Sequence, residues 1–534
     1  MTVAPPRARV PQRSRFEVAF VSTTVYANPL HEAALSITFT SPAGLAHRVD
    51  GFWDGGASWR ARFKPDELGQ WAFTSACSDT TNSGLHAQSG AFVCVEPSGE
   101  TRFDQHGPLR VSANRRFLEH ADGTPFLWLC DTAWSGPLRS TAEEWSHYLR
   151  ERARQGFSAV QWVATQYLAA PDGDLDGQLP YAGHDQIAIN PAFYQRLDQR
   201  LNALNAAGLL GAPVLLWAAT WSDSADVNNS NPGWTLPEDQ AILLARYMVA
   251  RWGAHDLVWI LNGDGDYRGP KAERWHRIGQ ALFGERAHAP VVLHPSGMNI
   301  PTEEFREQAW LDITGYQSGH GDDEETQRWL VFGPPAQDWQ RDPPRPSINL
   351  EPPYENHIAY QSQQPISPLI VRRALYWSLL NAPTAGVSYG GHGVWGWDDG
   401  TSPPVAHPKT GVPLPWRAAL VMPAAEQLHT LAELFNGIEW WRLRPAPALI
   451  LMQPGQTLPS RTILAARTDA GDLALLYTPE QGTLELNLAD LQPNLAARWV
   501  NPSTGERFDA AYIGTTDHAQ FTPPAAGDWV LLLS

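Results

Sequence analysis

Between residues 122 and 435 the chain alternates short apolar runs with amphipathic segments, and this alternation occurs eight times. The strands are expected at 126–130, 159–164, 213–217, 258–261, 291–294, 312–316, 347–350 and 386–389. The helices are expected at about 141–156, 191–207, 237–252, 271–283, 302–308, 322–331, 368–381 and 416–435. Parallel strands need crossover helices, and eight such units close into a barrel. The sequence therefore predicts an α/β fold with a central (β/α)8 TIM barrel over residues 121–440.

Antiparallel β structure is predicted on both sides of the barrel. Residues 15–97 contain short alternating runs separated by turn clusters such as Asp54-Gly-Gly, which is typical of an immunoglobulin-like β-sandwich. Residues 441–534 show the same pattern and predict a C-terminal β-sandwich. A connecting β segment is expected at 98–120, and the Pro- and Arg-rich residues 1–14 are expected to form a flexible tail.

The charge of the chain restricts its partners. The formal net charge is −17, and no block of Lys and Arg occurs, which argues against nucleic acid and against an anionic membrane surface. No run of 18 apolar residues and no apolar signal core occur, so we expect a cytoplasmic protein. The 24 tryptophans offer flat apolar faces that match sugar rings, so a carbohydrate substrate fits best. The oligomeric state stays open, a homo-oligomer included.

Two apolar runs stop abruptly at a carboxylate, and they suggest where the chemistry lies. One run ends at Asp264, on strand four of the predicted barrel, and the other ends at Glu351, on strand seven. With side chains alternating between faces, Ser347, Asn349 and Glu351 are expected to share one face, as are Asn262 and Asp264. Both carboxylates would then meet at the C-terminal rim, where barrel active sites lie. Two carboxylates facing one cleft are the minimal equipment for cleaving a glycosidic bond.

Each of these carboxylates has an alternative. The segment after Asp264 is rich in turn residues, so this side chain could instead cap the next helix. Glu355 rivals Glu351 as nucleophile, although two prolines separate it from the strand end. In an inverting hydrolase Glu355 or Asp266 would supply the base, at a carboxylate separation that sequence does not give.

Further candidates for substrate binding lie at the predicted strand ends and in the loops behind them. They are Asp131, Trp134, Gln161, Trp221, Asn262, His294, Tyr316, Tyr354, Glu355, His392, Trp395 and Trp397. Asp131 could instead orient Trp134 or an arginine. Asn262 and Asn349 could bind the hydroxyl next to the anomeric carbon of a sugar.

Several motifs resemble those of a known family. Pro125-Phe-Leu-Trp-Leu-Cys-Asp-Thr-Ala-Trp134, Arg154-Gln-Gly-Phe-Ser-Ala-Val-Gln161, Trp259-Ile-Leu-Asn-Gly-Asp264 and Asn349-Leu-Glu-Pro-Pro-Tyr-Glu355 resemble the apiosidase-like glycoside hydrolases. The resemblance covers nearly the whole chain, including both sandwiches. It implies a retaining hydrolase of furanosides, such as β-linked apiosides, with Asp264 as acid/base and Glu351 as nucleophile. We expect no secretion signal, whereas an extracellular role is common in that family.

Other functions remain consistent with the sequence. The chain could cleave another furanoside or a pyranoside, as an arabinofuranosidase or a galactosidase does, or it could bind a glycan without turnover. No nucleotide-binding or zinc-protease motif stands in a fitting context, so no cofactor is expected. His276, His288 and His294 do not form a convincing metal set, and no metal is expected either.

Overall fold

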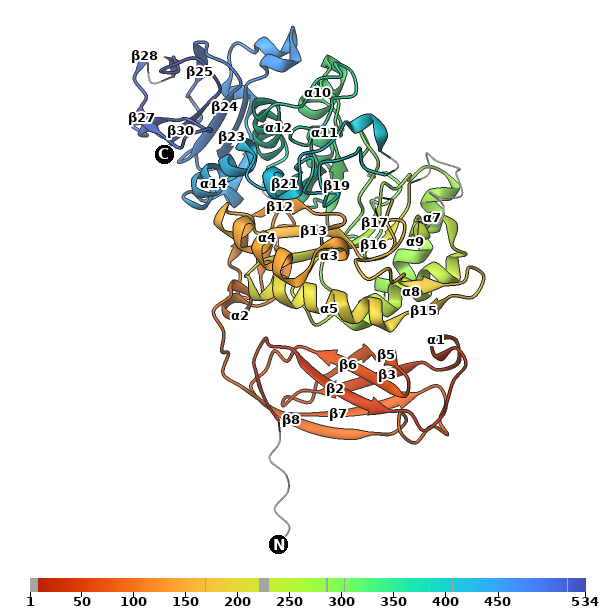
Figure 1. Ribbon diagram of the computed structural model, residues 1–534. Helices are drawn as coiled ribbons and strands as arrows, with labels where there is room; N and C mark the ends of the chain where they lie inside the picture. The colour runs from red at the N-terminus through yellow and green to blue at the C-terminus, as the bar shows by residue number, and fades with distance from the viewer. Residues whose placement is uncertain are drawn as a thin grey trace.

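Eight parallel strands form the centre of the computed structural model, which describes residues 8–168, 170–219, 230–284, 287–301, 303–383, 385–405, 407–515 and 517–534. In chain order these strands are β12 (Trp128–Thr132), β13 (Ala159–Val163), β16 (Leu210–Trp217), β17 (Trp259–Gly263), β18 (Val291–Val292), β19 (Thr314–Gln317), β20 (Ser347–Glu351) and β21 (Gly386–Tyr389). Each lies beside the next in the chain, and β21 pairs with β12. A parallel bridge between Val292 and Ile313 closes the ring between β18 and β19. The predicted (β/α)8 barrel is confirmed (Figure 1).

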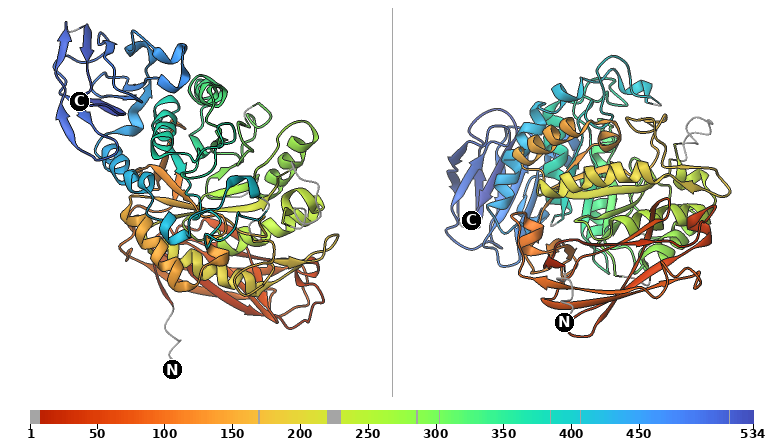
Figure 2. Two further views of the ribbon diagram at one scale, coloured as in Figure 1. Left: turned by 45° about the horizontal axis from the view of Figure 1, so that its top comes forward. Right: turned by 60° about the horizontal axis from the view of Figure 1, so that its bottom comes forward.

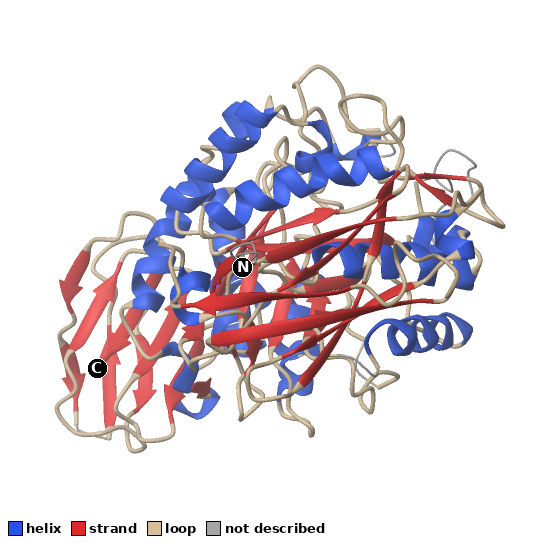
Figure 3. Ribbon diagram, turned by 90° about the horizontal axis from the view of Figure 1, so that it is seen from below, coloured by secondary structure: helices blue, strands red, loops and turns tan. Residues whose placement is uncertain are grey.

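Seven helices of nine or more residues belong to the barrel in the described part of the chain; helices are blue in Figure 3. They are α4 (Ala142–Arg154), α5 (Pro191–Ala206), α8 (Glu238–Trp252), α9 (Pro270–Phe283), α10 (Glu324–Phe332), α12 (Pro368–Asn381) and α14 (Pro423–Asn436). Caps fix where several of them begin: Thr141 and Glu144 form a capping box, and Asn190 and Ser367 accept backbone N–H groups.

Two predicted helices differ in the structure. Residues 303–307 form turns in place of the helix expected near 302–308. The helix expected at 416–435 is divided into α13 (Trp416–Ala419) and α14, because Pro423 starts a new helix at a position where the missing N–H costs no hydrogen bond. Shorter helices α3 (Gly136–Arg139), α7 (Pro232–Thr235) and α11 (Pro334–Trp339) lie between the barrel units.

The N-terminal residues form two facing sheets below the barrel in Figure 1. One has the order β1 (Arg9–Pro11), β8 (Ser89–Val95), β7 (Gly69–Cys77), β3 (Leu35–Thr40), β4 (Ala46–Asp50), and the other β2 (Phe16–Val21), β6 (Ser58–Phe63), β5 (Phe52–Gly55). Arg9–Pro11, which the sequence placed in a tail, pairs with β8. A short hairpin sheet of β9 (Leu109–Val111), β10 (Leu118–His120) and β11 (Pro125–Phe126) follows helix α2 (Arg102–His106).

The C-terminal residues form a second antiparallel unit, blue in Figure 2. Its larger sheet has the order β22 (Leu443–Pro445), β23 (Leu464–Thr468), β24 (Ala474–Thr478), β30 (Trp529–Leu533), β26 (Ala497–Val500), β27 (Arg507–Asp509). The smaller sheet contains β25 (Leu484–Asn487), β29 (His518–Phe521) and β28 (Tyr512–Gly514). Helix α12 joins this unit to the barrel, since the rings of Tyr376 and Tyr477 stack at 5.0 Å and Arg372 pairs with Asp528 at 2.7 Å.

A buried ion network joins the N-terminal sandwich to the barrel. Asp198 of α5 accepts hydrogen bonds from Arg62 of β6 at 2.6 Å and from Arg251 of α8 at 2.8 Å. Trp252 Nε1 donates to the same carboxylate at 2.7 Å. Both guanidinium groups also lie over the ring of Phe52. No helix among the described residues is both long and apolar enough to cross a membrane.

We expect Asp198→Ala to lower the free energy of unfolding by about 3–5 kcal/mol, because it leaves two buried guanidinium groups without their shared counter-charge. Urea unfolding followed by tryptophan fluorescence measures this change. An exposed turn carboxylate serves as the control, since Asp469→Ala should stay within about 0.5 kcal/mol of wild type. Equal stability of the two variants would contradict the importance of the network.

Candidate active site

Asp264 lies directly after β17 at the mouth of the barrel. Its backbone φ is 51°, in the left-handed region that aspartate enters more readily than most residues. Gly263 allows the close approach of Trp217, since a Cβ at residue 263 would lie 2.2 Å from that indole. The Gly265 N–H donates to the carbonyl of His294 at 3.1 Å. The turn after β17 therefore fixes Asp264 between Trp217 and the end of the neighbouring strand.

A β-bulge stands immediately before Glu351. Tyr316 of β19 pairs with Asn349, but the next residue, Gln317, pairs with Glu351, so Leu350 has no partner on β19. The pairing of β20 with β21 also ends at Asn349. One extra residue in a strand reverses the faces of all residues that follow it. Glu351 and Gln317 consequently both line the cavity at the barrel mouth.

The prediction that Ser347, Asn349 and Glu351 share one face is wrong, because it assumed an unbroken strand. Asn349 Nδ2 donates to the hydroxyl of Ser378 on α12 at 3.1 Å, so this amide points away from the barrel interior. Leu350 belongs to the apolar cluster inside the barrel. Asn349 is therefore not placed to bind a sugar hydroxyl as expected.

Gln161 of β13 holds the bulge. Its Nε2 donates to the carbonyl of Leu350 at 2.7 Å and to Thr132 Oγ1 at 2.8 Å. A buried carbonyl without a ladder partner needs another donor. The sequence predicts that Gln161 binds substrate. In the structure it instead donates a hydrogen bond to Leu350, the bulge residue that turns Glu351 toward the mouth.

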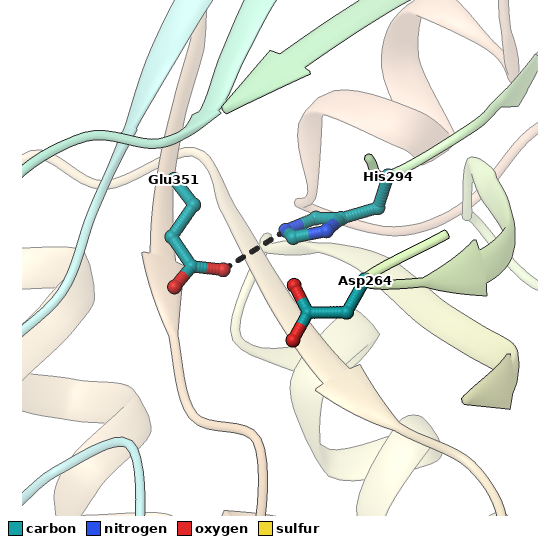
Figure 4. Close-up of side chains that lie close together, drawn as sticks. All are labelled: Asp264, His294 and Glu351. Atoms are coloured by element: carbon teal, nitrogen blue, oxygen red, sulfur yellow. Dashed lines mark ion pairs between the residues drawn. The ribbon is translucent and has the colours of Figure 1, made fainter. Parts of the chain in front are cut away.

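The two predicted catalytic carboxylates face each other across the mouth (Figure 4). An oxygen of Asp264, an oxygen of Glu351 and a ring nitrogen of His294 all lie within 4.8 Å of one another. His294 Nε2 lies 3.2 Å from Glu351 Oε2. The ends of strands four and seven thus meet in space as the sequence predicted.

A second histidine orients the other oxygen of Glu351. The backbone N–H of Tyr354 donates to His320 Nδ1 at 3.3 Å, so the Nε2 of the neutral ring carries the proton and donates to Glu351 Oε1 at 3.0 Å. Burial alone would raise the pKa of Glu351, but hydrogen bonding from His294 and His320 lowers it to about 2. Glu351 is therefore ionised over the physiological range.

The cavity around these groups has a volume of about 500 Å³. Its wall is largely aromatic, with Trp134, Tyr167, Trp217, Tyr354, Tyr360 and Trp395. The indole nitrogens of Trp217 and Trp395 and the Oε1 of Gln317 are buried and lack hydrogen-bond partners among the described residues. Such groups cost free energy unless a ligand satisfies them. The cavity therefore suits a ligand with apolar faces and several hydroxyl groups.

Five of the predicted site residues line this cavity: Asp264, Glu351, Trp134, Tyr354 and Trp395. His294 lies behind them and contacts both Glu351 and the ring of Trp134, 5.3 Å away. Asn262 is fully buried, and its Oδ1 accepts a hydrogen bond from Tyr267 at 2.8 Å.

Two predicted carboxylates are engaged elsewhere in the interior. Asp131 accepts hydrogen bonds from Arg152 Nε and the Tyr148 hydroxyl, both at 2.6 Å. It therefore orients an arginine, which was the alternative interpretation of this residue. Glu355 accepts from the Tyr389 hydroxyl at 2.7 Å and from the backbone N–H of Ala424 at the start of α14 at 2.9 Å. Neither lines the catalytic cavity.

Three more predicted residues do not line the cavity. Tyr316 lies on the outer side of the barrel near Trp329, because the bulge gives the inner position to Gln317. His392 stacks behind Trp395, and Trp397 stacks on Trp416 at 4.2 Å. Trp221 lies outside the described residues.

The structure also bears on the alternative roles of Asp264 and Asp266. Helix α9 begins at Pro270 without a side-chain cap, so Asp264 does not cap it. Asp266 is paired with Arg268 at 2.9 Å and Lys271 at 2.8 Å, and hydrogen bonds from these cations hold its pKa well below its usual range.

Sequence reasoning missed several residues that line the cavity, chiefly Tyr167, Gln317, His320, His357, Tyr360 and His407. All of them lie at the end of a barrel strand or in a loop that follows one. That position was the available signal, because the loops after the strands build the sites of this architecture. It does not distinguish a loop residue that points inward from one that points outward.

Asp264, His294 and Glu351 are also the described residues that could together hold a metal ion. Carboxylate and imidazole ligands suit several divalent metals. However, His294 and Glu351 already lie in contact at 3.2 Å and face Asp264, and a pair of facing carboxylates has a use without any metal.

Comparisons with known proteins identify a family and similar folds. The family described as "Apiosidase-like, catalytic domain" matches residues 112–442, a domain of unknown function matches 9–78, and a putative collagen-binding domain of a collagenase matches 445–534. A putative glycoside hydrolase from Bacteroides vulgatus is similar at 17% identity with a TM-score of 0.71, covering 99% of this chain and 100% of its own. A family 5 glycoside hydrolase from the same organism has 20% identity and a TM-score of 0.70, covering 82% and 94%. No curated protein matches the chain.

The lowered pKa of Glu351 predicts how stability depends on pH. Its charged form stabilises the folded state above the unfolded pKa near 4.5, and this contribution is lost as pH falls toward about 2. Between pH 5 and 2.5, Glu351→Gln should therefore lose about 2 kcal/mol less free energy of unfolding than wild type loses.

Glu355→Gln is the matched control, because its effect on the pH dependence of stability should have the opposite sign. Burial raises the pKa of Glu355, so the folded state takes up its proton first and gains stability as pH falls. This variant should lose more free energy of unfolding than wild type over the same pH range. Urea unfolding at both pH values measures all three proteins, and equal slopes for the two variants would contradict the assignment.

Proposed function

The chain belongs to the apiosidase-like family of glycoside hydrolases, and we propose that it cleaves a furanoside, such as a β-linked apioside, in the cavity at the barrel mouth. Glu351 acts as the nucleophile and Asp264 as the general acid/base. The observation that carries this proposal is the pair of facing carboxylates within 4.8 Å, of which Glu351 is held ionised by His294 and His320.

The first step forms a covalent intermediate. Glu351 attacks the anomeric carbon while Asp264, in its protonated form, gives its proton to the leaving oxygen. The bond from the anomeric carbon to the leaving oxygen breaks, and an ester between the sugar and Glu351 forms. A nucleophile must be ionised before it attacks, and the contacts of Glu351 with His294 and His320 favour its charged form.

The second step returns the enzyme to its starting state. Asp264 is now a carboxylate and takes a proton from a water molecule, which attacks the anomeric carbon and releases Glu351. Two successive inversions at that carbon give net retention. The separation within 4.8 Å supports this course, because retaining enzymes hold their carboxyl groups about 5–5.5 Å apart and inverting enzymes about 6.5–9.5 Å.

The sugar is held by the groups that lack partners in the wall. The Trp217 and Trp395 indole N–H groups can donate to sugar oxygens, and Gln317 Oε1 can accept from a hydroxyl group. Aromatic faces of the same wall cover the apolar C–H faces of the ring. One sugar ring bound among these groups brings its anomeric carbon between the two carboxylates.

A panel of 4-nitrophenyl furanosides and pyranosides, of both anomeric configurations, tests the proposal. We expect turnover of a furanoside, with 4-nitrophenyl β-D-apiofuranoside the first candidate. Glu351→Gln and Asp264→Asn should each lower kcat by about 10²–10⁴-fold, since each removes one of the two reacting groups. Asp264→Asn should retain more activity on a substrate with a good leaving group, which needs little protonation.

Two controls accompany this experiment. Glu355→Gln should keep activity within a few-fold of wild type, because Glu355 bonds to Tyr389 and α14 and not to the cavity. Assays after treatment with a chelator test whether a cation at Asp264, His294 and Glu351 takes part. Full activity of Glu351→Gln would move the nucleophile elsewhere, and binding of sugars without any turnover would overturn the hydrolase assignment.

The stereochemical outcome is a separate prediction. Hydrolysis should retain the anomeric configuration, because a directly attacking Glu351 requires two inversions. Proton NMR of the first product, recorded before mutarotation, shows its configuration. A first product of opposite configuration would make Glu351 at most a general base for water.

A further inference from the structure

A second cavity lies at the same end of the barrel as the catalytic one. Its volume is about 660 Å³, and the loops that follow β12, β13 and β21 line it. No residue of the catalytic pair contacts it. The C-terminal end of a barrel is where substrates bind, so a second cavity there is a candidate for a ligand.

Two loops form a wall between the cavities. In the loop after β13, Tyr167 lines the catalytic cavity and Ala170 lines the second one, and the two residues form a backbone bridge. In the loop after β21, Trp395 lines the catalytic cavity and Trp397 lines the second one. The loops after β13 and β21 therefore each contribute residues to both cavities.

The second cavity contains buried polar groups without partners. Asp398 is 7% exposed, and its Oδ2 has no hydrogen-bond partner among the described residues. The indole nitrogen of Trp397, itself 5% exposed, also lacks one there. Burial raises the pKa of Asp398 to about 7, with Arg139 acting in the opposite direction. A buried carboxyl group without a partner is costly, and a bound ligand can remove that cost.

The backbone at this place is strained as well. Trp397 has a φ of 57°, a conformation that a bulky side chain rarely adopts. Strained residues gather at ligand sites, where the surrounding structure holds them in place. Here the strained Trp397 and the neighbouring Asp398 both line the second cavity.

We propose that the second cavity binds a further sugar residue of the glycan whose cleaved residue occupies the catalytic cavity. The proposal rests on the proposed function, since it assigns a second binding position for the same substrate. Asp398 accepts hydrogen bonds from sugar hydroxyls, and the Trp397 indole N–H donates one to a sugar oxygen.

Recognition at this position depends on hydrogen bonds and not on stacking. The ring of Trp416 stacks on that of Trp397 at 4.2 Å, and the Arg417 guanidinium lies 4.4 Å from its centre. Trp416 is 7% exposed, which leaves little of its ring for a sugar. Substitution of Asp398 should therefore remove most of the affinity that this cavity contributes.

Kinetics with a short and a long substrate test the proposal. The short probe is 4-nitrophenyl β-D-apiofuranoside, and the long probe is a trisaccharide with the same terminal sugar. Asp398→Leu should raise KM for the trisaccharide about tenfold, the loss expected for one or two hydrogen bonds, with kcat unchanged. Its kcat/KM for the aryl glycoside should stay within about twofold of wild type.

Controls separate binding from stability. Asp398→Leu removes a buried carboxyl group without a partner, so Tm should not fall, and Asp398→Asn should restore part of the trisaccharide affinity. The exposed Asp509→Leu should change neither substrate. An unchanged trisaccharide KM in Asp398→Leu, or an equal loss on both substrates, would overturn the proposal.

Calorimetric titration of the trisaccharide into Glu351→Gln gives a readout without turnover. If adding Asp398→Leu weakens binding about tenfold, the second position is supported. This holds even if wild type hydrolyses neither probe, because the lack of hydrolysis would overturn only the proposed function. If wild type hydrolyses the aryl glycoside but Asp398→Leu leaves the affinity for the trisaccharide unchanged, only the second position is overturned.

Discussion

The orientation of Glu351, the proposed nucleophile, depends on one extra residue in a strand. Because Leu350 is unpaired on β19, the faces of β20 exchange just before the strand ends, and Glu351 turns into the mouth. The cost of that irregularity is a carbonyl without a ladder partner, and Gln161 supplies the missing donor at 2.7 Å. Without the bulge, Glu351 would point toward the helices, and the facing pair of carboxylates would not exist.

The barrel was predicted well from the sequence, because the spacing of apolar residues along the chain reflects which side chains are buried. All eight strands were placed near their observed positions, and Asp264 and Glu351 were assigned to the ends of strands four and seven. The same reasoning misplaced Asn349 and Tyr316, since a bulge leaves no mark in the hydrophobic pattern of either strand. Alternation shows which residues share a face only as long as the pairing stays regular.

Loop residues form the part of the site that the sequence could not supply. His320 orients Glu351 from the loop after β19, where nothing in its neighbourhood separates it from a structural histidine. Asp131 shows the reverse case: it ends a strand, yet it is directed to Arg152 on α4. Whether a polar residue faces the cavity or a helix depends on contacts between segments that are far apart in the chain.

The environment of the pair then divides the two roles. Both oxygens of Glu351 face an imidazole, which favours the charged form even though the group is buried, whereas Asp264 stands at the open side, on a turn beside Trp217. Two like charges this close cannot both be favoured in a largely apolar cavity. In the proposed mechanism Glu351, the carboxylate with two imidazole neighbours, is the anion, and Asp264 carries the proton. The different surroundings of the two groups follow from where β17 and β20 end.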